Sequence, residues 1–431
     1  MQKVNTAPLS GFMQLLPEDQ IEFDRIKQVI LNAHHRNGFL SIETPIVHRQ
    51  ELLFAKAGSD TEKQIYQLEK GDHKLALRFD LTVPLAAYVA ENQSYLNFPF
   101  KASNIGKVYR GERSQRGRYR EFYQCDADVI ARGELDIAYD AEIIGLIHEI
   151  YSELNFGKFT LRVSNRKLLN GFLNSLGLGE KSIEVSRIID DAEKISEQEF
   201  VQKLQDLKVA QKTIDHITQF INIKGESTEI IAQLRDLKIT DEQFLTGLSE
   251  LQTVMSLLAA KNVTTAKIDL MIVRGLDYYT GTVYETILND HPNVGSVSSG
   301  GRYDNLTSTF SNETFQGVGG SIGLTRLFSV LKEIGIIKSE NTAPADLLVI
   351  PMSPDQFPFC YKLATDLRSQ NLKIDTYLAS GKVAKKLSFA DKSHIPYTIV
   401  VGENEVETNR LHVKNMTDGS LTPLDEFLQN R

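Results

Sequence analysis

Residues 274–285, Arg-Gly-Leu-Asp-Tyr-Tyr-Thr-Gly-Thr-Val-Tyr-Glu, place a cation, a carboxylate and paired phenols beside two glycines. A guanidinium such as that of Arg274 can hold a phosphate or a carboxylate through two parallel hydrogen bonds. The apolar residues of 267–273 recur at a period of two and predict a strand that delivers Arg274 to a fixed position. The stretch predicts a site for a small polar ligand beside an anion. Taken alone, Tyr278 and Tyr279 fit equally well with the packing of a half-buried hairpin.

A second group of reactive side chains lies between two predicted strands, where five arginines fall within residues 110–120. Arginine at this density is typical of phosphate recognition. The strands would fix Arg110 and the face that carries Phe122 and Gln124, while the loop between them stays free to meet a mobile polyanion. On charge alone, a solvated basic loop is the favoured interpretation.

Two further stretches carry groups suited to a nucleotide and to an amine. Glycine-rich residues 317–328 let the backbone approach a nucleotide, the helix start that follows presents free N–H groups, and Arg326 adds a cation over the phosphates. The stretch matches neither the Walker A pattern nor GxGxxG, so it gives no support for a P-loop or a Rossmann fold. Asp80 and Thr82 follow an apolar strand at a spacing of two, and a carboxylate and a hydroxyl on one face can hold an ammonium group. Without these neighbours, Asp80 would be interpreted as a cap at a strand end.

The elements that position these residues follow from the apolar periodicity. Residues 21–35 have helical spacing, and residues 39–47 predict an extended strand interrupted by Pro45, which suits an edge or an interface. Because several strands follow one another with few helices between them, we expect a mainly antiparallel sheet in an α+β core. The other predicted elements of this core are strands at 75–79, 102–109 and 120–130, a helix at 136–154, strands within 267–310 and a helix that ends near 334.

Two regions differ from this core. Residues 176–262 are rich in Glu, Lys, Gln, Leu and Ile and contain no proline, which predicts an inserted helical domain. Its mixed charge fits a solvated module as well as a nucleic-acid surface. Residues 345–431 alternate strands and helices and predict a small α/β domain with a parallel or mixed sheet. The core is therefore expected to consist of residues 1–175 and 263–336.

The composition limits the possible functions. With 431 residues, 41% of them hydrophobic and 24% charged, the chain is expected to form two or three domains. Its net charge of −8 repels polyanions at long range, so any nucleic-acid contact must be local. Cys125 and Cys360 lie far apart without a CxxC or a Cys/His cluster, so neither a disulfide framework nor a protein-held metal is predicted. A start without an apolar signal core, and the lack of any apolar run of membrane-span length, predict a cytoplasmic location.

Taken together, these motifs resemble those of histidyl-tRNA synthetases, which are class II aminoacyl-tRNA synthetases. Residues 274–285 are similar to one histidine signature, and Ser298-Ser-Gly-Gly-Arg-Tyr-Asp-Asn305 is similar to the second. The Tyr-Arg-x-Glu opening and the Arg-Tyr-Arg-Glu-Phe-Tyr-Gln close of residues 107–128 resemble motif 2, and Gly323-Leu-Thr-Arg326 resembles the end of motif 3. The resemblance covers nearly the whole chain and implies that residues 345–431 form a domain like the family's anticodon-binding domain.

The resemblance implies a role for each motif residue. The residues implied to bind histidine are Asp80, Leu81, Thr82, Arg110, Gln124, Asp128, Arg274, Tyr278 and Tyr279, with Asp128 and Tyr279 flanking the imidazole. Those implied to bind ATP are Arg110, Glu112, Phe122 and Arg326, with Phe122 stacked on adenine and with Arg110 and Arg274 as the catalytic cations at the α-phosphate. Those expected to bind tRNA are Arg113, Arg116, Lys382, Lys385 and Lys386. Gly300 and Gly301 would let the backbone approach the amino acid, with Arg302 and Tyr303 in support. Asp128 stands where many members of the family carry glutamate.

We therefore expect the activity of this family. Histidine and ATP would form histidyl-adenylate with release of pyrophosphate, and the acyl group would then move to the terminal ribose of tRNA(His) without a covalent enzyme intermediate. Mg²⁺ is expected on the distal phosphates, and a homodimer is expected through the first helix and residues 39–47.

Two alternatives remain open. The first is a non-catalytic paralogue, the regulatory subunit of ATP phosphoribosyltransferase, which normally lacks the terminal domain and has degraded signatures. The second is a purely structural RNA-binding protein, which would not need Arg110, Phe122 and Arg326 together.

Overall fold

The computed structural model of the chain describes residues 4–55, 59–113, 116–273, 279–339 and 345–430. The chain divides into two compact units, one of residues 1–13 and 27–336 and the other of residues 14–26 and 337–431. The first helix, α1 (Pro17–Arg36), contributes residues to both units. Among the described residues, no helix is both long and apolar enough to span a lipid bilayer.

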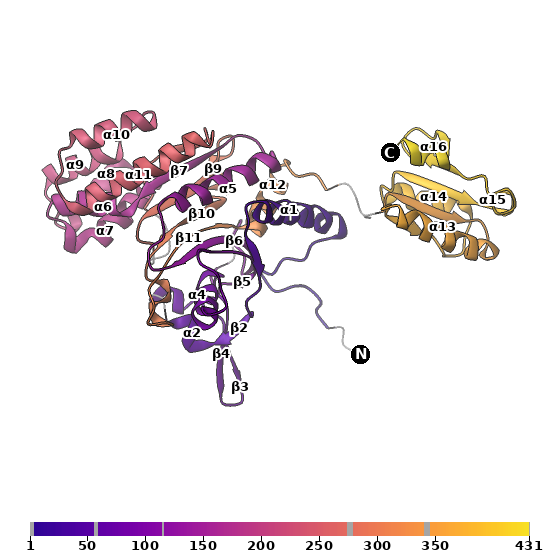
Figure 1. The fold of residues 1–431 in the computed structure, drawn as a ribbon, viewed down its shortest axis with the longest axis horizontal. Helices are drawn as coiled ribbons and strands as arrows, with labels where there is room; N and C mark the ends of the chain where they lie inside the picture. Colours follow the sequence, from indigo (N-terminus) through magenta and orange to yellow (C-terminus); the bar gives the residue numbers. More distant parts are fainter. Residues whose placement is uncertain (1–3, 56–58, 114–115, 274–278, 340–344, 431) are drawn as a thin grey trace. The chain divides into compact units, whose positions relative to one another are not determined.

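A mixed eight-stranded sheet forms the centre of the first unit (Figure 1), in the order β1-β5-β6-β11-β10-β9-β7-β8. Neighbouring strands from β5 to β7 are antiparallel, whereas β1 and β8 join the two edges in parallel. This sheet confirms the predicted mainly antiparallel core. Its strands are β1 (Leu40–Ile42), β5 (Phe100–Tyr109), β6 (Glu121–Arg132), β7 (Phe159–Asn165), β8 (Ala266–Ile268), β9 (Thr282–Leu288), β10 (Ser298–Tyr303) and β11 (Phe315–Ile322).

Helices α5 (Ala138–Leu154) and α12 (Leu324–Glu333) pack against strands of this sheet. The apolar residues of α5 recur every three or four positions, so one side of the helix is buried. A Cβ atom at Gly320 of β11 would lie 3.2 Å from Ile143 Cγ2, which shows how closely α5 approaches the strand. Two short 3₁₀ helices, η3 (Pro292–Val294) and η4 (Leu306–Thr309), complete this part of the fold.

A smaller antiparallel sheet, with strand order β2-β4-β3, lies beside α4 (Thr82–Asn92). Its strands are β2 (Val47–Arg49), β3 (Gln67–Lys70) and β4 (His73–Leu77), and its short helices are α2 (Gln50–Phe54) and α3 (Ser59–Glu62). The predicted single strand over residues 39–47 is therefore wrong. Its two ends belong to β1 and β2 in different sheets, because Pro45 lacks the N–H that would continue a ladder.

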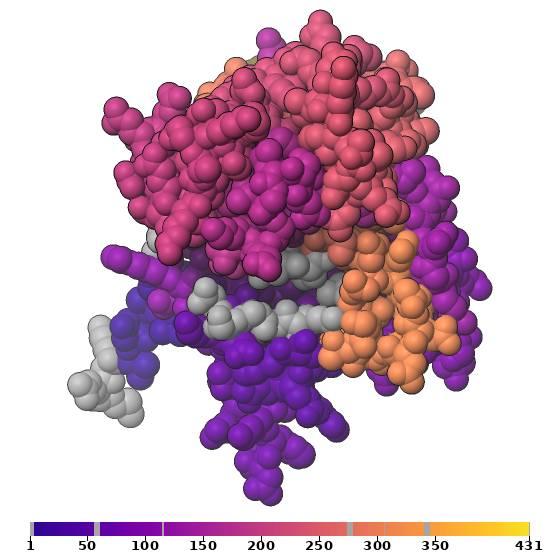
Figure 2. All heavy atoms as spheres, turned by 90° about the vertical axis from the view of Figure 1, so that its left-hand side faces the viewer, coloured from indigo at the N-terminus to yellow at the C-terminus, as the bar shows by residue number. Residues whose placement is uncertain are grey.

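Six α-helices follow β7 and form the upper part of the face shown in Figure 2, above the violet segment that contains the small sheet. They are α6 (Arg166–Ser175), α7 (Ser182–Asp191), α8 (Glu197–Asp206), α9 (Gln211–Ile221), α10 (Ser227–Asp236) and α11 (Glu242–Ala260), with η1 (Gly179–Lys181) and η2 (Ala192–Lys194) between them. The helical periodicity of the sequence predicted that this region is helical. The boundaries of an inserted domain stay a prediction.

Glycines let α6 and α11 cross at short range. A Cβ atom at Gly247 would lie 2.2 Å from Leu168 N, and one at Gly171 would lie 2.1 Å from Phe244 N. Both obstacles are backbone atoms, which cannot rotate away. We expect Gly247→Ala to lower the free energy of unfolding by about 1–3 kcal/mol or more, because the helices must move apart.

The melting temperature of purified Gly247→Ala, compared with that of the wild-type protein, measures this effect. The matched control is Gly145→Ala in α5, where the new methyl group would meet the end of the Lys261 side chain, with Cδ at 3.5 Å and Nζ at 3.6 Å, both ordinary contacts. In that helix, alanine should be neutral or stabilise by up to about 1 kcal/mol. Equal melting temperatures for the two variants would contradict the close crossing.

The second unit contains a five-stranded sheet with strand order β13-β12-β14-β15-β16. Strand β12 pairs in parallel with β13 and β14, and the remaining pairs are antiparallel, so the sheet is mixed. Its elements are β12 (Leu347–Pro351), η5 (Pro354–Gln356), α13 (Phe357–Ser369), β13 (Ile374–Thr376), α14 (Val383–Lys392), β14 (Tyr397–Val401), α15 (Glu403–Thr408), β15 (His412–Asn415), β16 (Leu421–Pro423) and α16 (Leu424–Gln429).

Candidate active site

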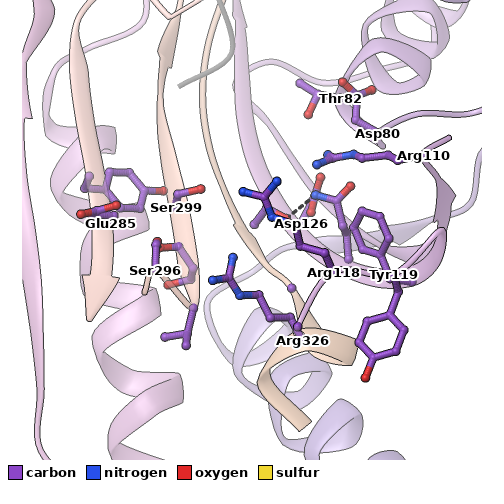
Figure 3. Close-up of a pocket in the computed structure, with 18 of the residues that line it drawn as sticks. Asp80, Thr82, Arg110, Arg118, Tyr119, Asp126, Glu285, Ser296, Ser299 and Arg326 are labelled. Carbon is purple, nitrogen blue, oxygen red and sulfur yellow. Dashed lines mark hydrogen bonds between the residues drawn. The ribbon is translucent and has the colours of Figure 1, made fainter. Parts of the chain in front are cut away.

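A cavity of about 420 Å³ lies over the eight-stranded sheet. In Figure 3, Glu285, Ser296 and Ser299 lie across from Asp80 and Arg110, with Asp126 between the two groups. The predicted histidine- and ATP-binding residues that line the cavity are Asp80, Thr82, Arg110, Glu112, Phe122, Gln124, Tyr279 and Arg326. The structure thus brings together residues from stretches that are far apart in the sequence.

The register of the sheet builds the floor of this cavity. Asp126 of β6 pairs with Ser321 of β11, Ser321 pairs with Ser299 of β10, and Ser299 pairs with Glu285 of β9. Directly paired residues project to the same face of a sheet, so these polar side chains form one row. At the end of the row, Arg162 of β7 pairs with Glu285.

Asp80 and Thr82 stand at the start of a helix and not on a strand. Strand β4 ends at Leu77, Thr82 is the first residue of α4, and Asp80 Oδ1 accepts a hydrogen bond from Val83 N at 3.0 Å. The prediction that they share a strand face is therefore wrong, although both line the cavity. Pro84 in the first turn suits a helix start, which is the signal that could have located it. Leu81 precedes the helix, is buried in the core, and does not line the cavity.

Arg110 lies between two aromatic rings. Its guanidinium carbon is 4.4 Å from the centre of the Phe79 ring and 5.0 Å from that of Phe122, and its Nε donates to Phe79 O at 3.3 Å. Burial raises the pKa of Asp80, and the positive charge of Arg110 opposes that rise. The strand end and the two rings thus hold one cation in the wall of the cavity, beside a buried carboxyl group.

Asp128 lies deeper than the prediction implied. It is 3% exposed and is not among the residues that line the cavity; Tyr303 Oη donates to its Oδ1 at 2.9 Å. Burial raises the pKa of Asp128 to about 7, and the bond from Tyr303 opposes the rise. Its place depends on Gly319, where a Cβ atom would lie 1.9 Å from Oδ1.

The second signature supplies room for aromatic rings. A Cβ atom at Gly301 would lie 3.0 Å from Tyr279 Cδ1, and one at Gly300 would lie 2.2 Å from Tyr284 Oη. Arg302 forms a buried ion pair with Asp140 at 2.8 Å. The missing side chains of Gly301 and Gly300 thus leave space for the rings of Tyr279 and Tyr284. Arg302 does not line the cavity and pairs with Asp140 instead.

Asp126 is a cavity residue that sequence reasoning missed. It is 3% exposed, its Oδ1 has no hydrogen-bond partner, and it lies on the same face of β6 as Gln124 and Asp128. Ser321 bonds to Asp126 and accepts from Gln124 Nε2 at 2.8 Å. Burial raises the pKa of Asp126 well above its ordinary value, and the neighbouring Asp128 raises it further. Asp126 lies two residues after Gln124, and this spacing on a strand could have predicted that both side chains face the cavity.

The arginines of the motif 2 loop differ in their surroundings. Arg118 pairs with Glu112 at 3.4 Å, and Arg116 pairs with Glu333 at 2.8 Å. Arg113 is exposed. Arg326 donates to Val294 O at 2.7 Å and lines the cavity. The loop side chains around the cavity are thus partly held by carboxylates.

Arg274 and Tyr278 lie outside the described residues. The strand predicted to deliver Arg274 is too long, because β8 ends at Ile268 and Asp269 Oδ1 then accepts from Met271 N at 3.0 Å in a turn. Among the described residues, no group of three His, Cys, Asp or Glu side chains could hold a metal ion.

The lysines of the second unit do not form one exposed group. Lys382 and Lys385 are exposed, but Lys386 is 3% exposed and its Nζ donates to Pro351 O at 2.8 Å. The prediction that Lys386 contacts tRNA is therefore wrong. The helical period of α14 turns this side chain inward, where it binds the end of β12.

Comparison with known proteins places these features in a family. The family model described as histidyl-tRNA synthetase matches residues 11–327, and the model described as an anticodon binding domain matches residues 346–429. The histidine–tRNA ligase of Clostridium tetani is 47% identical over 420 residues, covering 97% of this chain and 95% of that protein. The histidine–tRNA ligase of Clostridium acetobutylicum is 41% identical over 425 residues, covering 98% of each chain.

Solved structures agree with this result. The crystal structure of histidyl-tRNA synthetase from Nostoc sp. PCC 7120 aligns with a TM-score of 0.92 and 36% identity, over 99% of both chains. A structure from Bacillus halodurans, described as an ATP phosphoribosyltransferase regulatory subunit/histidyl-tRNA synthetase, shares the fold with a TM-score of 0.75 at 21% identity. The family match over most of the chain and the high identity of full-length relatives show that this chain belongs to the histidyl-tRNA synthetase family.

Proposed function

We propose that this chain is a histidine–tRNA ligase that joins L-histidine to ATP and then transfers the histidyl group to the terminal ribose of tRNA(His). The carboxylate of histidine attacks the α-phosphorus, pyrophosphate leaves, and histidyl-adenylate forms. A hydroxyl group of the tRNA ribose then attacks the acyl carbon, and AMP leaves. The observation that carries the proposal is the convergence of Asp80, Gln124, Arg110, Phe122 and Arg326 on one cavity.

In this proposal, Arg110 meets the α-phosphate as negative charge develops there. A preorganised cation in a partly closed site stabilises such charge without reorganisation at the moment of reaction. The Phe79 and Phe122 rings hold the Arg110 guanidinium from two sides, which supports this role. Phe122 also offers a face on which adenine can stack, and Glu112 and Arg326 line the same cavity. Arg274 is proposed to act beside Arg110.

Histidine is proposed to bind at the carboxylate end of the cavity. Its ammonium group would meet Asp80, Thr82 and the Gln124 Oε1 atom, which is buried without a hydrogen-bond partner. Its imidazole would reach toward Asp128, with Tyr279 and Tyr278 completing the pocket. A pocket built of paired polar groups rejects side chains that leave these groups unpaired.

The other partners are also proposals. Mg²⁺ commonly binds through phosphates and a few carboxylates, so it would enter with the distal phosphates of ATP. A homodimer through α1 and residues 39–47 is supported by edge strand β1, where Leu40 is 62% exposed. Sedimentation should then report about twice the chain mass of 48.5 kDa. We also propose a cytoplasmic location.

The non-catalytic paralogue is not favoured. The chain retains the part matched by the anticodon binding domain, and it is 47% identical to a full-length ligase. The discriminating experiment is ATP–pyrophosphate exchange with each of the twenty amino acids. We expect exchange with histidine, and the complete lack of exchange in a folded protein would favour the regulatory role.

Lys382 and Lys385, two exposed lysines at the start of α14, are proposed to contact tRNA phosphates. Replacing Lys382 and Lys385 with alanine should reduce the slope of log Kd for tRNA against log salt by about one to two, since each neutralised phosphate releases roughly 0.7–0.9 of a counterion. Filter binding over a salt series measures the slope. The matched control, Lys386→Met, should lower the melting temperature and leave the slope unchanged, because Lys386 is buried. A wild-type slope in the double variant would remove this surface from the proposal.

A further inference from the structure

Arg162 of β7 binds three carboxylates at once. Its Nε donates to Asp269 Oδ2 at 2.7 Å, its Nη1 donates to Glu285 Oε1 at 2.9 Å, and its Nη2 donates to Glu193 Oε1 at 2.7 Å. The Arg162 side chain is only 15% exposed. Burial lowers the pKa of Arg162, but its bonds to Asp269 and Glu193 outweigh that effect and raise it. The guanidinium is therefore a fixed cation with each of its nitrogens engaged.

The three carboxylates belong to three different parts of the unit. Glu285 lies on β9 and lines the cavity, with a side chain that is 9% exposed. Asp269 directly follows β8, and its other oxygen accepts a hydrogen bond from Met271 N. This turn comes just before buried Ile272, which also lines the cavity. Glu193 lies in η2, within the helical segment formed by residues 166–260. One side chain thus joins the cavity wall, the turn after β8 and the helical segment.

The charges make this contact costly to lose. Glu285 and Asp269 have side chains 9% and 23% exposed, so removal of Arg162 would leave two largely buried carboxylates beside each other. An uncompensated buried charge is strongly destabilising, and like charges separate or take up protons. Separation would move Glu285 in the cavity wall or the turn that carries Ile272, and protonation would remove a charge from that wall.

We propose that Arg162 is a positioning residue of the ligase reaction: it fixes Glu285 and the turn at Asp269 in the cavity wall and ties both to the helical segment through Glu193. This inference rests on the proposed function. Arg162 itself is not among the residues that line the cavity, so it acts through Glu285 and Asp269. The position of the helical segment and the shape of the substrate site are then coupled through one guanidinium.

Lys267 provides a matched control. It is the direct partner of Arg162 in the β7–β8 register, and its Nζ also bonds the helical segment, at Glu226 Oε2 at 2.8 Å. Glu226 is 72% exposed in its side chain and does not line the cavity. Lys267→Met therefore removes a tie between the sheet and the helices without freeing a cavity carboxylate.

The experiment compares Arg162→Met, Arg162→Lys, Glu193→Gln and Lys267→Met with the wild type. For histidine-dependent pyrophosphate exchange, we expect Arg162→Met to lower kcat/KM by about 10- to 100-fold, because a misplacement of about 1 Å at a reacting site costs up to about 100-fold. Arg162→Lys should recover part of the loss, since it keeps the charge without the planar fork. Glu193→Gln should lower kcat/KM measurably, and Lys267→Met should change it less than twofold.

Amide hydrogen exchange supplies a readout that does not depend on activity. Protection of residues 269–273 and 282–288 should fall in Arg162→Met and stay unchanged in Lys267→Met. Equal effects of Arg162→Met and Lys267→Met, or unchanged protection with wild-type kinetics in folded Arg162→Met, would overturn the proposal. If Arg162→Met does not fold, wild-type kinetics and protection in Glu193→Gln would overturn the tie to the helices. A wild-type protein without histidine-dependent exchange would refute the proposed function and leave the hydrogen-exchange comparison as the test of Arg162.

Discussion

Replacing Arg110 with alanine is expected to reduce histidine-dependent pyrophosphate exchange by about 10²- to 10³-fold while the protein stays folded. The loss of one preorganised contact to developing charge typically costs about 3–4 kcal/mol of the activation barrier. Arg110 is the cation that the cavity wall holds between the Phe79 and Phe122 rings. We would measure kcat and KM for ATP and histidine beside a melting curve, and the loss should fall mainly on kcat.

The matched control for this experiment is Arg132→Ala. Arg132 ends β6, the strand that follows Arg110, and does not line the cavity. Its replacement removes the same charge from the same sheet and should leave exchange within about twofold of wild type, as surface changes away from a site usually have small effects. Near wild-type exchange in folded Arg110→Ala, or equal losses in both variants, would remove Arg110 from the mechanism.

The second large effect is expected at Asp128, as a dependence on pH. Burial raises the pKa of Asp128 to about 7, so its carboxyl group keeps its proton below that pH in the free protein. The carboxylate accepts an imidazole N–H more strongly than the neutral acid does, because a hydrogen bond to a charged acceptor is the stronger one, and it keeps the bond from Tyr303 Oη. The kcat/KM for histidine should therefore rise with pH through about 7, because this ratio reports groups of the free enzyme.

Asp128→Asn separates this titration from that of histidine itself. The variant keeps the size of the side chain and an oxygen for Tyr303, but it has no ionisable group. We expect a loss of about 10- to 100-fold at pH 8, since a hydrogen bond to a charged group contributes about 1.5–3 kcal/mol. The variant should lose the step near pH 7 that belongs to Asp128. A pH profile with the same shape as that of the wild type would show that Asp128 does not control histidine use.

Much of the site could be predicted because its residues sit in short local patterns. The spacing around Arg110, Phe122 and Gln124 is set by two adjacent strands, and the glycine-rich strand before Arg326 is read from one stretch of sequence. The mainly antiparallel core followed for the same reason. These features depend on residues that are close together in the sequence, and the local apolar pattern of the sequence predicts such features directly.

The remaining features depend on contacts between distant segments. Glu285 reaches the cavity row through the pairing of β9 with β10, and a single sequence does not give that register. Lys386 is directed inward by the packing of α14, which its charge does not reveal. Asp80 and Thr82 are two residues apart, which fits one face of a strand but also fits the start of a helix. So few residues do not distinguish the two elements, and the strand was the wrong choice.

Aminoacylation of bulk tRNA with each of the twenty amino acids, in the presence of ATP and Mg²⁺, tests the central claim most directly. We expect the protein to charge tRNA with histidine, amino acids without an imidazole to be charged at a small fraction of that rate, and Arg110→Ala to lower the histidine signal by about 10²- to 10³-fold. Charging with a different amino acid, or no charging with any of the twenty by a folded protein, would contradict this claim.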